Sequence, residues 1–240
     1  SEAVDALSTT QLRSFKSTQI GALSTTAIGT LSTAQIAGLL TTQIAGLTKT
    51  QIGALTTDQV AGLATTQLVV LTPAQMLALG TDDLAALAAT QIAAFNATQI
   101  AGLAPDVLAS LAVTQIAALG STQVKNLTVA QVAALTSAQA AALSTTVIAN
   151  LTTTQVKSLT STNVGALAVT QVGALTSAQL AAISSTGIAA LSTTQIKGVP
   201  ASGIGALTTT QVAGLTDDQI GALTTAQFAA MTAANLGALT

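Results

Sequence analysis

One octad determines how this chain folds: residues 55–63 read LTTDQVAGL and return to leucine after eight positions. Thr56 is a favoured helix N-cap residue, and Gln59, three positions later, completes a capping box. Leu55 and Val60 then occupy the two positions of a hydrophobic staple, one before the cap and one at the fourth helical residue. These four residues predict one short capped helix in every eight residues.

The octad recurs thirty times in 240 residues without an insertion or deletion. A leucine row begins at Leu7 and recurs every eighth residue to Leu239. An isoleucine row of Ile, Val or Leu, with three exceptions, runs from Val4 to Leu236 at the same interval. Glutamine precedes the isoleucine row in 21 of the thirty octads. This strict period predicts that residues 1–240 form a single uninterrupted octapeptide-repeat solenoid.

A period of eight excludes the regular continuous structures. Eight residues advance a continuous α-helix by about 80° beyond two turns, so its leucines would spiral around the axis. On a flat strand the leucine and isoleucine rows, five residues apart, would face opposite sides. A capped helix of about six or seven residues fits the octad, but it is too short to be stable alone. We therefore expect an all-α solenoid of thirty stacked short helices, with Leu and Ile inside and Thr, Ser and Gln facing water.

Proline and charged residues support this frame, although they were not used to set it. Pro73 and Pro105 fall at the first helical position, where proline is tolerated. Acidic residues fall in predicted first turns and basic residues in predicted last turns, where the helix dipole favours them. The acids are Asp58, Asp82, Asp106, Asp217 and Asp218, and the bases are Arg13, Lys125, Lys157 and Lys197.

A β-solenoid is the alternative fold. Three octads make a coil of 24 residues, and Thr and Ile favour strands. The capping pattern favours the helical solenoid, because it depends on position within the octad and not only on composition.

The composition predicts that the chain is not an enzyme. Only 6% of residues are charged, the formal net charge is −2, and His and Cys are absent. Six basic residues cannot form a nucleic-acid footprint, and without His there is no Ser-His triad. The adjacent carboxylates at 82–83 and 217–218 are interpreted as helix-start charges. We predict no catalytic, cofactor or metal site, and polar residues interrupt every apolar run too soon for a membrane span.

The two ends of the chain differ in charge. The first sixteen residues carry four of the fourteen charges, whereas residues 231–240 carry none. An uncapped solenoid end exposes apolar surface, and a head-to-tail contact that does not close produces a filament. We therefore expect self-association through a subunit interface that includes Val4, Leu7, Met231, Leu236 and Leu239.

The octad, as it stands in residues 47–55 and 207–215, resembles the octapeptide-repeat regions of long bacterial surface or secreted adhesin-like proteins. The resemblance covers the whole chain. It implies an extracellular or cell-surface structural role, as a filament subunit or adhesin stalk, and brings no active-site residues. Nine octads lack the capping glutamine, and five of these departures are Asp83, Val107, Val147, Gly187 and Gly203. The alternative function is ice binding through regular arrays of surface threonine.

Overall fold

The structure is a computed structural model that describes residues 2–239. These residues form thirty short α-helices, one per octad, and no strand. The helical solenoid is therefore confirmed, and the alternative β-solenoid is wrong. Each helix has four to six residues, slightly fewer than the sequence predicted.

The chain divides into two compact units, residues 1–119 and residues 120–240, and each is described by itself. The helices of the first unit are α1 (Glu2–Asp5), α2 (Thr9–Arg13), α3 (Ser17–Gly21), α4 (Thr25–Thr30), α5 (Thr33–Ala37), α6 (Thr41–Ala45), α7 (Lys49–Ile52), α8 (Thr57–Ala61), α9 (Thr65–Leu68), α10 (Pro73–Met76), α11 (Thr81–Ala86), α12 (Ala89–Ala94), α13 (Ala97–Ala101), α14 (Pro105–Ser110) and α15 (Val113–Ala117).

The helices of the second unit are α16 (Ser121–Lys125), α17 (Val129–Ala134), α18 (Ser137–Ala142), α19 (Thr145–Asn150), α20 (Thr153–Ser158), α21 (Ser161–Ala166), α22 (Val169–Gly173), α23 (Ser177–Ala182), α24 (Ser185–Ala189), α25 (Thr193–Gly198), α26 (Ala201–Gly205), α27 (Thr209–Ala213), α28 (Asp217–Ala222), α29 (Thr225–Ala230) and α30 (Ala233–Gly237). The prediction of a single solenoid over residues 1–240 stays a prediction.

From α2 to α30, each helix begins at the residue that the capping pattern predicts. At α8, the backbone N–H of Gln59 donates to the Thr56 hydroxyl at 3.2 Å, and the backbone N–H of Thr56 donates to Oε1 of the Gln59 side chain at 2.7 Å. Thr56 itself has extended backbone angles, φ −74° and ψ 156°. The side chains of Thr56 and Gln59 thus each accept from a backbone amide that the helix leaves unpaired.

The helices end without a left-handed turn: in some, such as α4, the residue after the helix is extended, whereas in others, such as α8, it stays right-handed (Gly62, φ −76°, ψ −9°). After α4, Leu31 (φ −62°, ψ 140°) and the next cap, Ser32 (φ −66°, ψ 156°), are both extended. No described residue has a positive φ. Two extended residues therefore redirect the chain between these helices, and a bulky leucine can occupy the turn.

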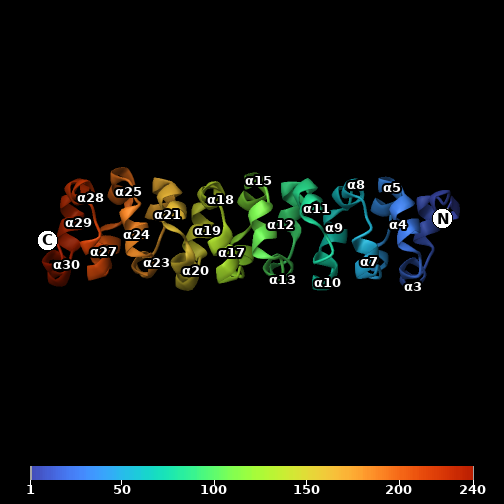
Figure 1. The fold of residues 1–240 in the computed structure, drawn as a ribbon, viewed down its shortest axis with the longest axis horizontal. Coiled ribbons are helices and arrows are strands. Elements are labelled where there is room, and N and C mark those ends of the chain that lie inside the picture. Colours follow the sequence, from blue (N-terminus) through green and yellow to red (C-terminus); the bar gives the residue numbers. More distant parts are fainter. Residues whose placement is uncertain (1, 240) are drawn as a thin grey trace. The chain divides into compact units, whose positions relative to one another are not determined.

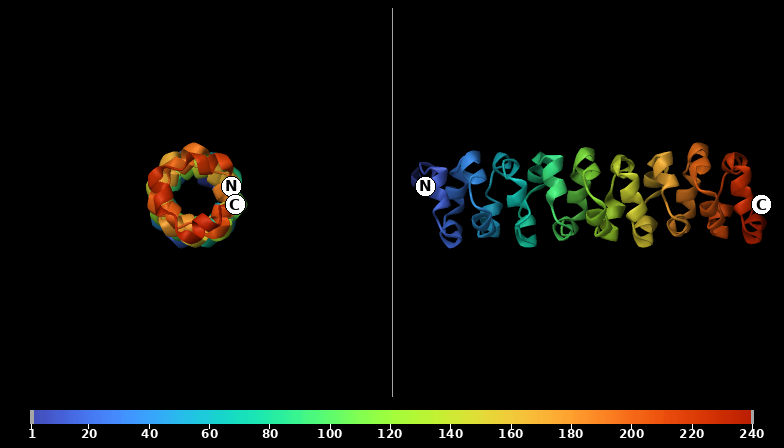
Figure 2. Two further views of the ribbon diagram at one scale, coloured as in Figure 1. Left: turned by 90° about the vertical axis from the view of Figure 1, so that its left-hand side faces the viewer. Right: turned by 180° about the vertical axis from the view of Figure 1, so that it is seen from behind.

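Within each unit, every helix packs on the helix three places along the chain, so that α5 packs on α8 and α22 on α25. Figures 1 and 2 show the short helices of each unit following one another around a common axis. Where a helix has glutamine at its third position, hydrogen bonds also join its start to the end of the helix four places earlier, as from α8 to α4. One turn of the superhelix therefore contains more than three and fewer than four octads.

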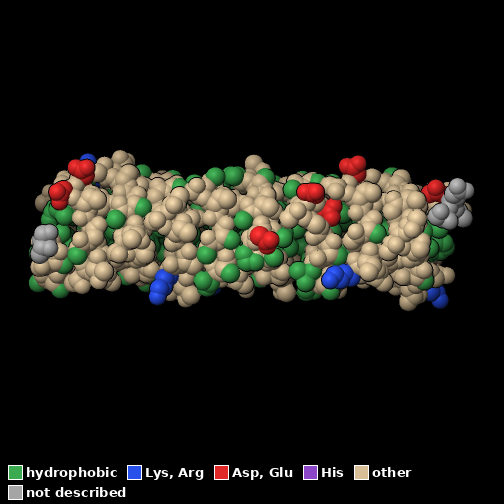
Figure 3. All heavy atoms as spheres, viewed as in Figure 1, with side chains coloured by type: hydrophobic (Ala, Val, Ile, Leu, Met, Phe, Trp, Pro, Cys, Tyr) green, Lys and Arg blue, Asp and Glu red, His purple; other side chains and the backbone are tan. Residues whose placement is uncertain are grey.

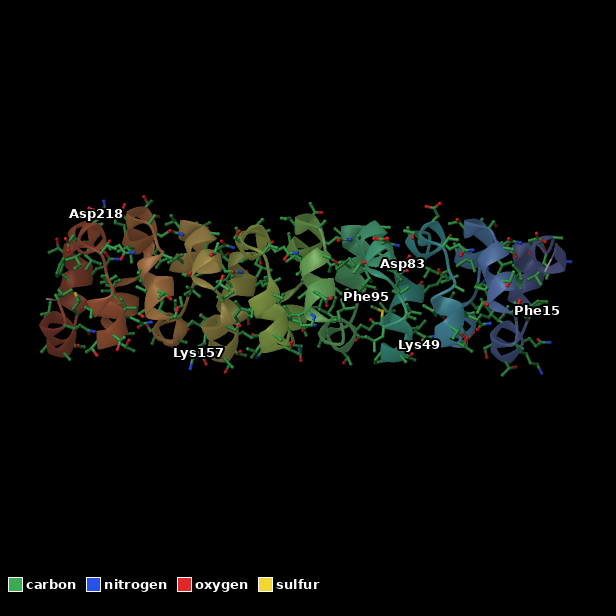
Figure 4. The ribbon with its side chains drawn as sticks, viewed as in Figure 1. Phe15, Lys49, Asp83, Phe95, Lys157 and Asp218 are labelled. Atoms are coloured by element: carbon green, nitrogen blue, oxygen red, sulfur yellow. The ribbon has the colours of Figure 1, made fainter. Side chains whose placement is uncertain are left out.

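The leucine and isoleucine rows form the core of each unit. From Leu12 to Val212, every residue of the isoleucine row is at most 2% exposed. Phe95, which replaces leucine in its row, lies inside its unit in Figure 4, whereas Lys157 and Asp218 lie at the outer surface. The inward position of both rows is as predicted.

Small residues at the helix ends allow successive turns to approach closely. A Cβ atom added at Gly21, the last residue of α3, would lie 2.8 Å from the carbonyl oxygen of Gly46, which follows α6. Because real Cβ atoms do not approach an oxygen so closely, glycine is required at Gly21 for this packing distance.

Candidate functional site

Buried glutamines connect successive turns within each unit. Gln99, the third residue of α13, is 1% exposed. Its Oε1 accepts a hydrogen bond from the backbone N–H of Asn96 at 2.9 Å, which completes the cap. Its Nε2 donates to the carbonyl oxygens of Leu68 at 3.0 Å and Leu71 at 2.9 Å. We call this arrangement the glutamine clamp, because one side chain holds the start of its own helix to the end of the helix four places earlier.

The glutamine clamp recurs with fixed separations in sequence. Nε2 donates to the carbonyls 28 and 31 residues earlier at Gln43, Gln51, Gln59, Gln67, Gln75, Gln99 and Gln115 in the first unit, and at Gln155, Gln171, Gln179, Gln211, Gln219 and Gln227 in the second. Asn163 and Asn235, one methylene shorter, donate only to the carbonyl 28 residues earlier.

The expectation that glutamine faces water is therefore wrong. Only the amide nitrogen can donate to the carbonyls of another turn, and burial of those carbonyls without a partner would be costly. The sequence carries a signal for this role. A capping box accepts Glu as well as Gln, yet no octad has Glu at this position, and Glu2 is the only glutamate in the chain.

Asp83 shows what a carboxylate does at the same position. Its Oδ2 accepts from the Gly80 amide at 3.0 Å, so the cap is kept. Its Oδ1 accepts from the Thr57 hydroxyl at 3.0 Å, on the helix three places earlier. A carboxylate therefore caps its helix but cannot donate to the carbonyls of the preceding turn.

At the N-terminal end of the first unit, the clamp position is incomplete. Gln11 and Gln19 are exposed and use Oε1 to cap their own helices, at 2.8 Å from the Ser8 and Lys16 amides. Neither Nε2 has an acceptor among the described residues. Three members of the leucine row are partly exposed here, namely Leu7, Phe15 and Leu23. We call this surface, with Gln11 and Gln19, the N-face.

At the C-terminal end of the second unit, the isoleucine row is exposed instead. Ile220 is partly exposed, Phe228 is 37% exposed and Leu236 is 47% exposed. Among the described residues, no side chain donates to the carbonyls of Ile220, Leu223, Phe228 or Met231. These residues form the surface that we call the C-face.

The residues predicted for a subunit interface lie at these two ends. Val4, Leu7 and Leu239 are partly exposed, and Leu236 is exposed, so each has free surface. Met231 is only 7% exposed and its side chain belongs to the core. Sequence reasoning missed Gln11, Gln19, Phe15, Leu23, Ile220 and Phe228, because it did not reveal which row each end leaves uncovered.

Charged side chains are few and scattered over the face shown in Figure 3. The first-turn acids and last-turn bases occupy their predicted helix ends, and Pro73 and Pro105 begin α10 and α14. Within residues 2–239, no three acidic, His or Cys side chains gather as metal ligands. A shallow groove of about 330 Å³ beside Leu40 and Ala64 contains a single charged residue, Arg13. None of the helices searched in the described chain is long and apolar enough to cross a membrane.

Comparison with known families finds the ALTTAQ repeat. Its model matches residues 1–33, 18–49, 27–57, 108–145 and 203–233, which together cover more than half of the chain. No curated protein matches the chain.

Proposed function

The chain belongs to the ALTTAQ repeat family, and we propose that it is a non-catalytic structural protein of the cell surface or exterior. It serves there as the stalk of an adhesin or as the subunit of a filament. The glutamine clamp is the observation that carries this proposal. In most octads the two apolar residues and the glutamine are all engaged in contacts with other octads, so the repeat is built to stack on itself.

The surface that remains supports a structural role over a catalytic one. Outside the core, most octads offer Ser and Thr hydroxyls, and the charges are few and, apart from the neighbouring carboxylates at 82–83 and 217–218, spread along the sequence. A catalytic site needs a base, an acid or a nucleophile with activated neighbours. Six of the eight carboxylates, Asp58, Asp82, Asp83, Asp106, Asp217 and Asp218, sit at helix starts, where their interaction with the helix dipole stabilises the helix.

Self-association in this function would bury the apolar side chains that the first and last described octads leave exposed. Leu236 and Phe228 leave apolar surface at one end, and Leu7 and Phe15 leave it at the other. Burial of such surface stabilises a contact by about 25 cal/mol per Å² before the cost of association. Because the chain carries few charges, electrostatic repulsion between copies opposes the contact only weakly.

Sedimentation velocity over a wide concentration range, followed by electron microscopy, tests the filament form. We expect species that lengthen with concentration at constant width. A monomer at every concentration would contradict self-association. Protease shaving of intact source cells tests the location, because a surface protein loses these octads and an internal one retains them.

Ice binding is the second candidate function. Its support is the row of first-position threonines on α2, α5, α8 and α11, which pack in succession: Thr9, Thr33, Thr57 and Thr81. The Thr57 hydroxyl, however, donates to Asp83, and the corresponding residues of the second unit are Val129, Thr153, Ser177, Ala201 and Thr225. Thermal hysteresis of the purified protein would support ice binding, and its absence would remove it.

A further inference from the structure

Two octads of the second unit have glycine at the clamp position, and both also change the leucine row. The glycines are Gly187 in α24 and Gly203 in α26, and no other octad of the chain has glycine there. Four residues before them, the leucine row holds Ile183 and Val199, which are its only β-branched members. Glycine in place of the clamp glutamine therefore occurs together with a β-branched residue in place of leucine.

The branched methyl groups lie directly beside these glycines. A Cβ atom added at Gly187 would lie 2.7 Å from Cγ2 of Ile183 and 3.5 Å from Cγ2 of Val164, on the helix three places earlier. A Cβ atom added at Gly203 would lie 3.0 Å from Cγ1 of Val199. We call each arrangement a methyl plug, because methyl groups occupy the space through which a glutamine side chain would have to leave the backbone.

The plugged octads keep their helices and lose only the donor to the earlier turn. The backbone N–H of Gly187 donates to the Ser184 hydroxyl at 3.0 Å, so α24 keeps half of its cap. The cap residue of α26 is Pro200, which has no N–H for a glutamine oxygen to accept. The carbonyls 28 residues before the glycines, at Leu159 and Leu175, have no donor among the described residues of the second unit.

Both plugs fall at one junction between turns. Each clamp reaches back four helices, so the clamp positions of α24, α25, α26 and α27 all span the junction between α23 and α24, which we call the plugged joint (Figure 1). Only Gln195 and Gln211 donate across it. At the junction between α19 and α20 all four positions donate, through Gln155, Asn163, Gln171 and Gln179. The plugged joint thus has half as many side chains donating across it.

A clamp and a methyl plug resist separation differently. Separation of a clamped junction breaks hydrogen bonds that stabilise the closed state by about 1 kcal/mol each. Separation of the plugged joint instead lets water donate to the Leu159 and Leu175 carbonyls, which favours the open state. The attraction between methyl groups is also short in range, because a gap of about 0.5–1 Å already removes a quarter to a half of it.

We propose that the plugged joint is a yielding joint: under tension or in dilute denaturant, the turns of the second unit separate there before they separate at the clamped junction between α19 and α20. The proposal rests on the structural role in the proposed function, in which the chain carries load, and adds the place where it lengthens. The helices on either side begin at local caps, so they can form again when the load is removed.

Native-state hydrogen exchange on dilute single chains tests the proposal first. These helices are too short to be stable when unstacked, so separation of turns exposes their amides to exchange. We expect residues 169–198, around the plugged joint, to exchange more than about ten-fold faster than residues 137–166, around the clamped junction.

The decisive variant is Ile183→Leu with Gly187→Gln, which removes one plug and supplies a donor for the Leu159 carbonyl. The matched control is Ile183→Leu with Gly187→Ala. Alanine has at least the helix propensity of glutamine but has no donor. Exchange of residues 169–198 should be at least about ten-fold slower in the glutamine variant than in the alanine control. The reverse change, Leu167→Ile with Gln171→Gly, should accelerate exchange of residues 137–166.

A force measurement tests the yielding itself. The chain has no cysteine, so Thr122→Cys with Ala226→Cys provides two unique handles at exposed second positions of α16 and α29. In magnetic tweezers, wild type with these handles should lengthen in an early step before the rest of the tethered segment unfolds. With Ile183→Leu and Gly187→Gln added, that early step should need a higher force.

Three results would overturn the proposal. Equal exchange around the plugged joint and the clamped junction would show that the plug is as strong as the clamp. An alanine control as slow as the glutamine variant would show that the missing donor is not the cause. An early step that keeps its force in the glutamine variant would place the yielding elsewhere. These measurements use single chains, so a protein found inside the cell would refute the proposed function and leave their outcome unchanged.

Discussion

Replacement of Gln99 by alanine removes one complete glutamine clamp while leaving the rest of its octad in place. The side chain loses its bond from the Asn96 amide and its two bonds to the carbonyls of Leu68 and Leu71. The Asn96 side chain still accepts from the backbone amide of residue 99 at 2.9 Å, so half of the cap survives. Gln19→Ala is the matched control, because Gln19 has the same position and only the capping bond.

The expected cost follows from which groups lose their partners. Three hydrogen bonds contribute about 1 kcal/mol each in net terms, and a buried carbonyl left without a partner adds about 1–3 kcal/mol. The Leu68 carbonyl retains the amide of Leu71 at 3.2 Å, so only the Leu71 carbonyl bears the larger cost. We expect Gln99→Ala to destabilise the surrounding turns by about 3–5 kcal/mol, and Gln19→Ala by about 0.5–1 kcal/mol.

The assay is native-state hydrogen exchange resolved by peptide, because repeat proteins open locally and a single global unfolding energy hides the effect. Exchange should accelerate in peptides covering residues 64–72 and 96–103. Gln99→Glu should cost at least as much as Gln99→Ala, since it keeps the capping acceptor but faces two carbonyls without a donor. If Gln99→Ala and Gln19→Ala cost the same, or if Gln99→Glu is neutral, the clamp does not hold the turns together.

One further substitution and two pairs of substitutions test the other parts of the fold, each by the urea midpoint followed with far-UV circular dichroism. Val107→Gln introduces the consensus glutamine clamp to the carbonyls 28 and 31 residues earlier, and it should stabilise the first unit by about 1–2 kcal/mol. An unchanged free energy of unfolding would show that the packing of Val107 already compensates for the missing clamp. Leu119→Asp places an unpaired charge in the core and should unfold its surroundings, whereas Leu77→Asp on the exposed surface should be nearly neutral; equal effects would contradict the inward leucine row. Gly21→Ala meets a backbone oxygen at 2.8 Å and should cost about 1–3 kcal/mol, whereas Gly221→Ala, with open space around it, should gain about 0.5–1 kcal/mol; a gain at both sites would refute the close approach of the turns.

Much of the fold follows from the sequence, because the octad encodes local structure. The start of α8 depends on Thr56 and Gln59, which lie within four residues of each other, and their geometry is determined by the helix itself. The inward position of Leu55 and Val60 follows from the same local frame. Such short-range chemistry predicts that a helix forms and where it begins.

The relation between turns is harder to predict, because it depends on groups about thirty residues apart. The angle between consecutive short helices sets the number of octads per turn, and two extended residues such as Leu31 and Ser32 determine that angle. A preference for glutamine over glutamate identifies a needed donor, but not its acceptors. The sequence therefore predicts exposed apolar surface at residues 231–240 without predicting which row is exposed there.

Exchange of the glutamine side-chain amides, followed by nuclear magnetic resonance on dilute single chains, tests the central claim most directly. We expect slow exchange of the Nε2 protons at clamp positions such as Gln43, Gln99 and Gln211, and fast exchange at Gln11 and Gln19, which reach no acceptor among the described residues. The contrast comes from one spectrum of one molecule, so the exposed glutamines serve as the internal control. Uniformly fast exchange at all of these positions would contradict the claim that glutamine holds successive turns together.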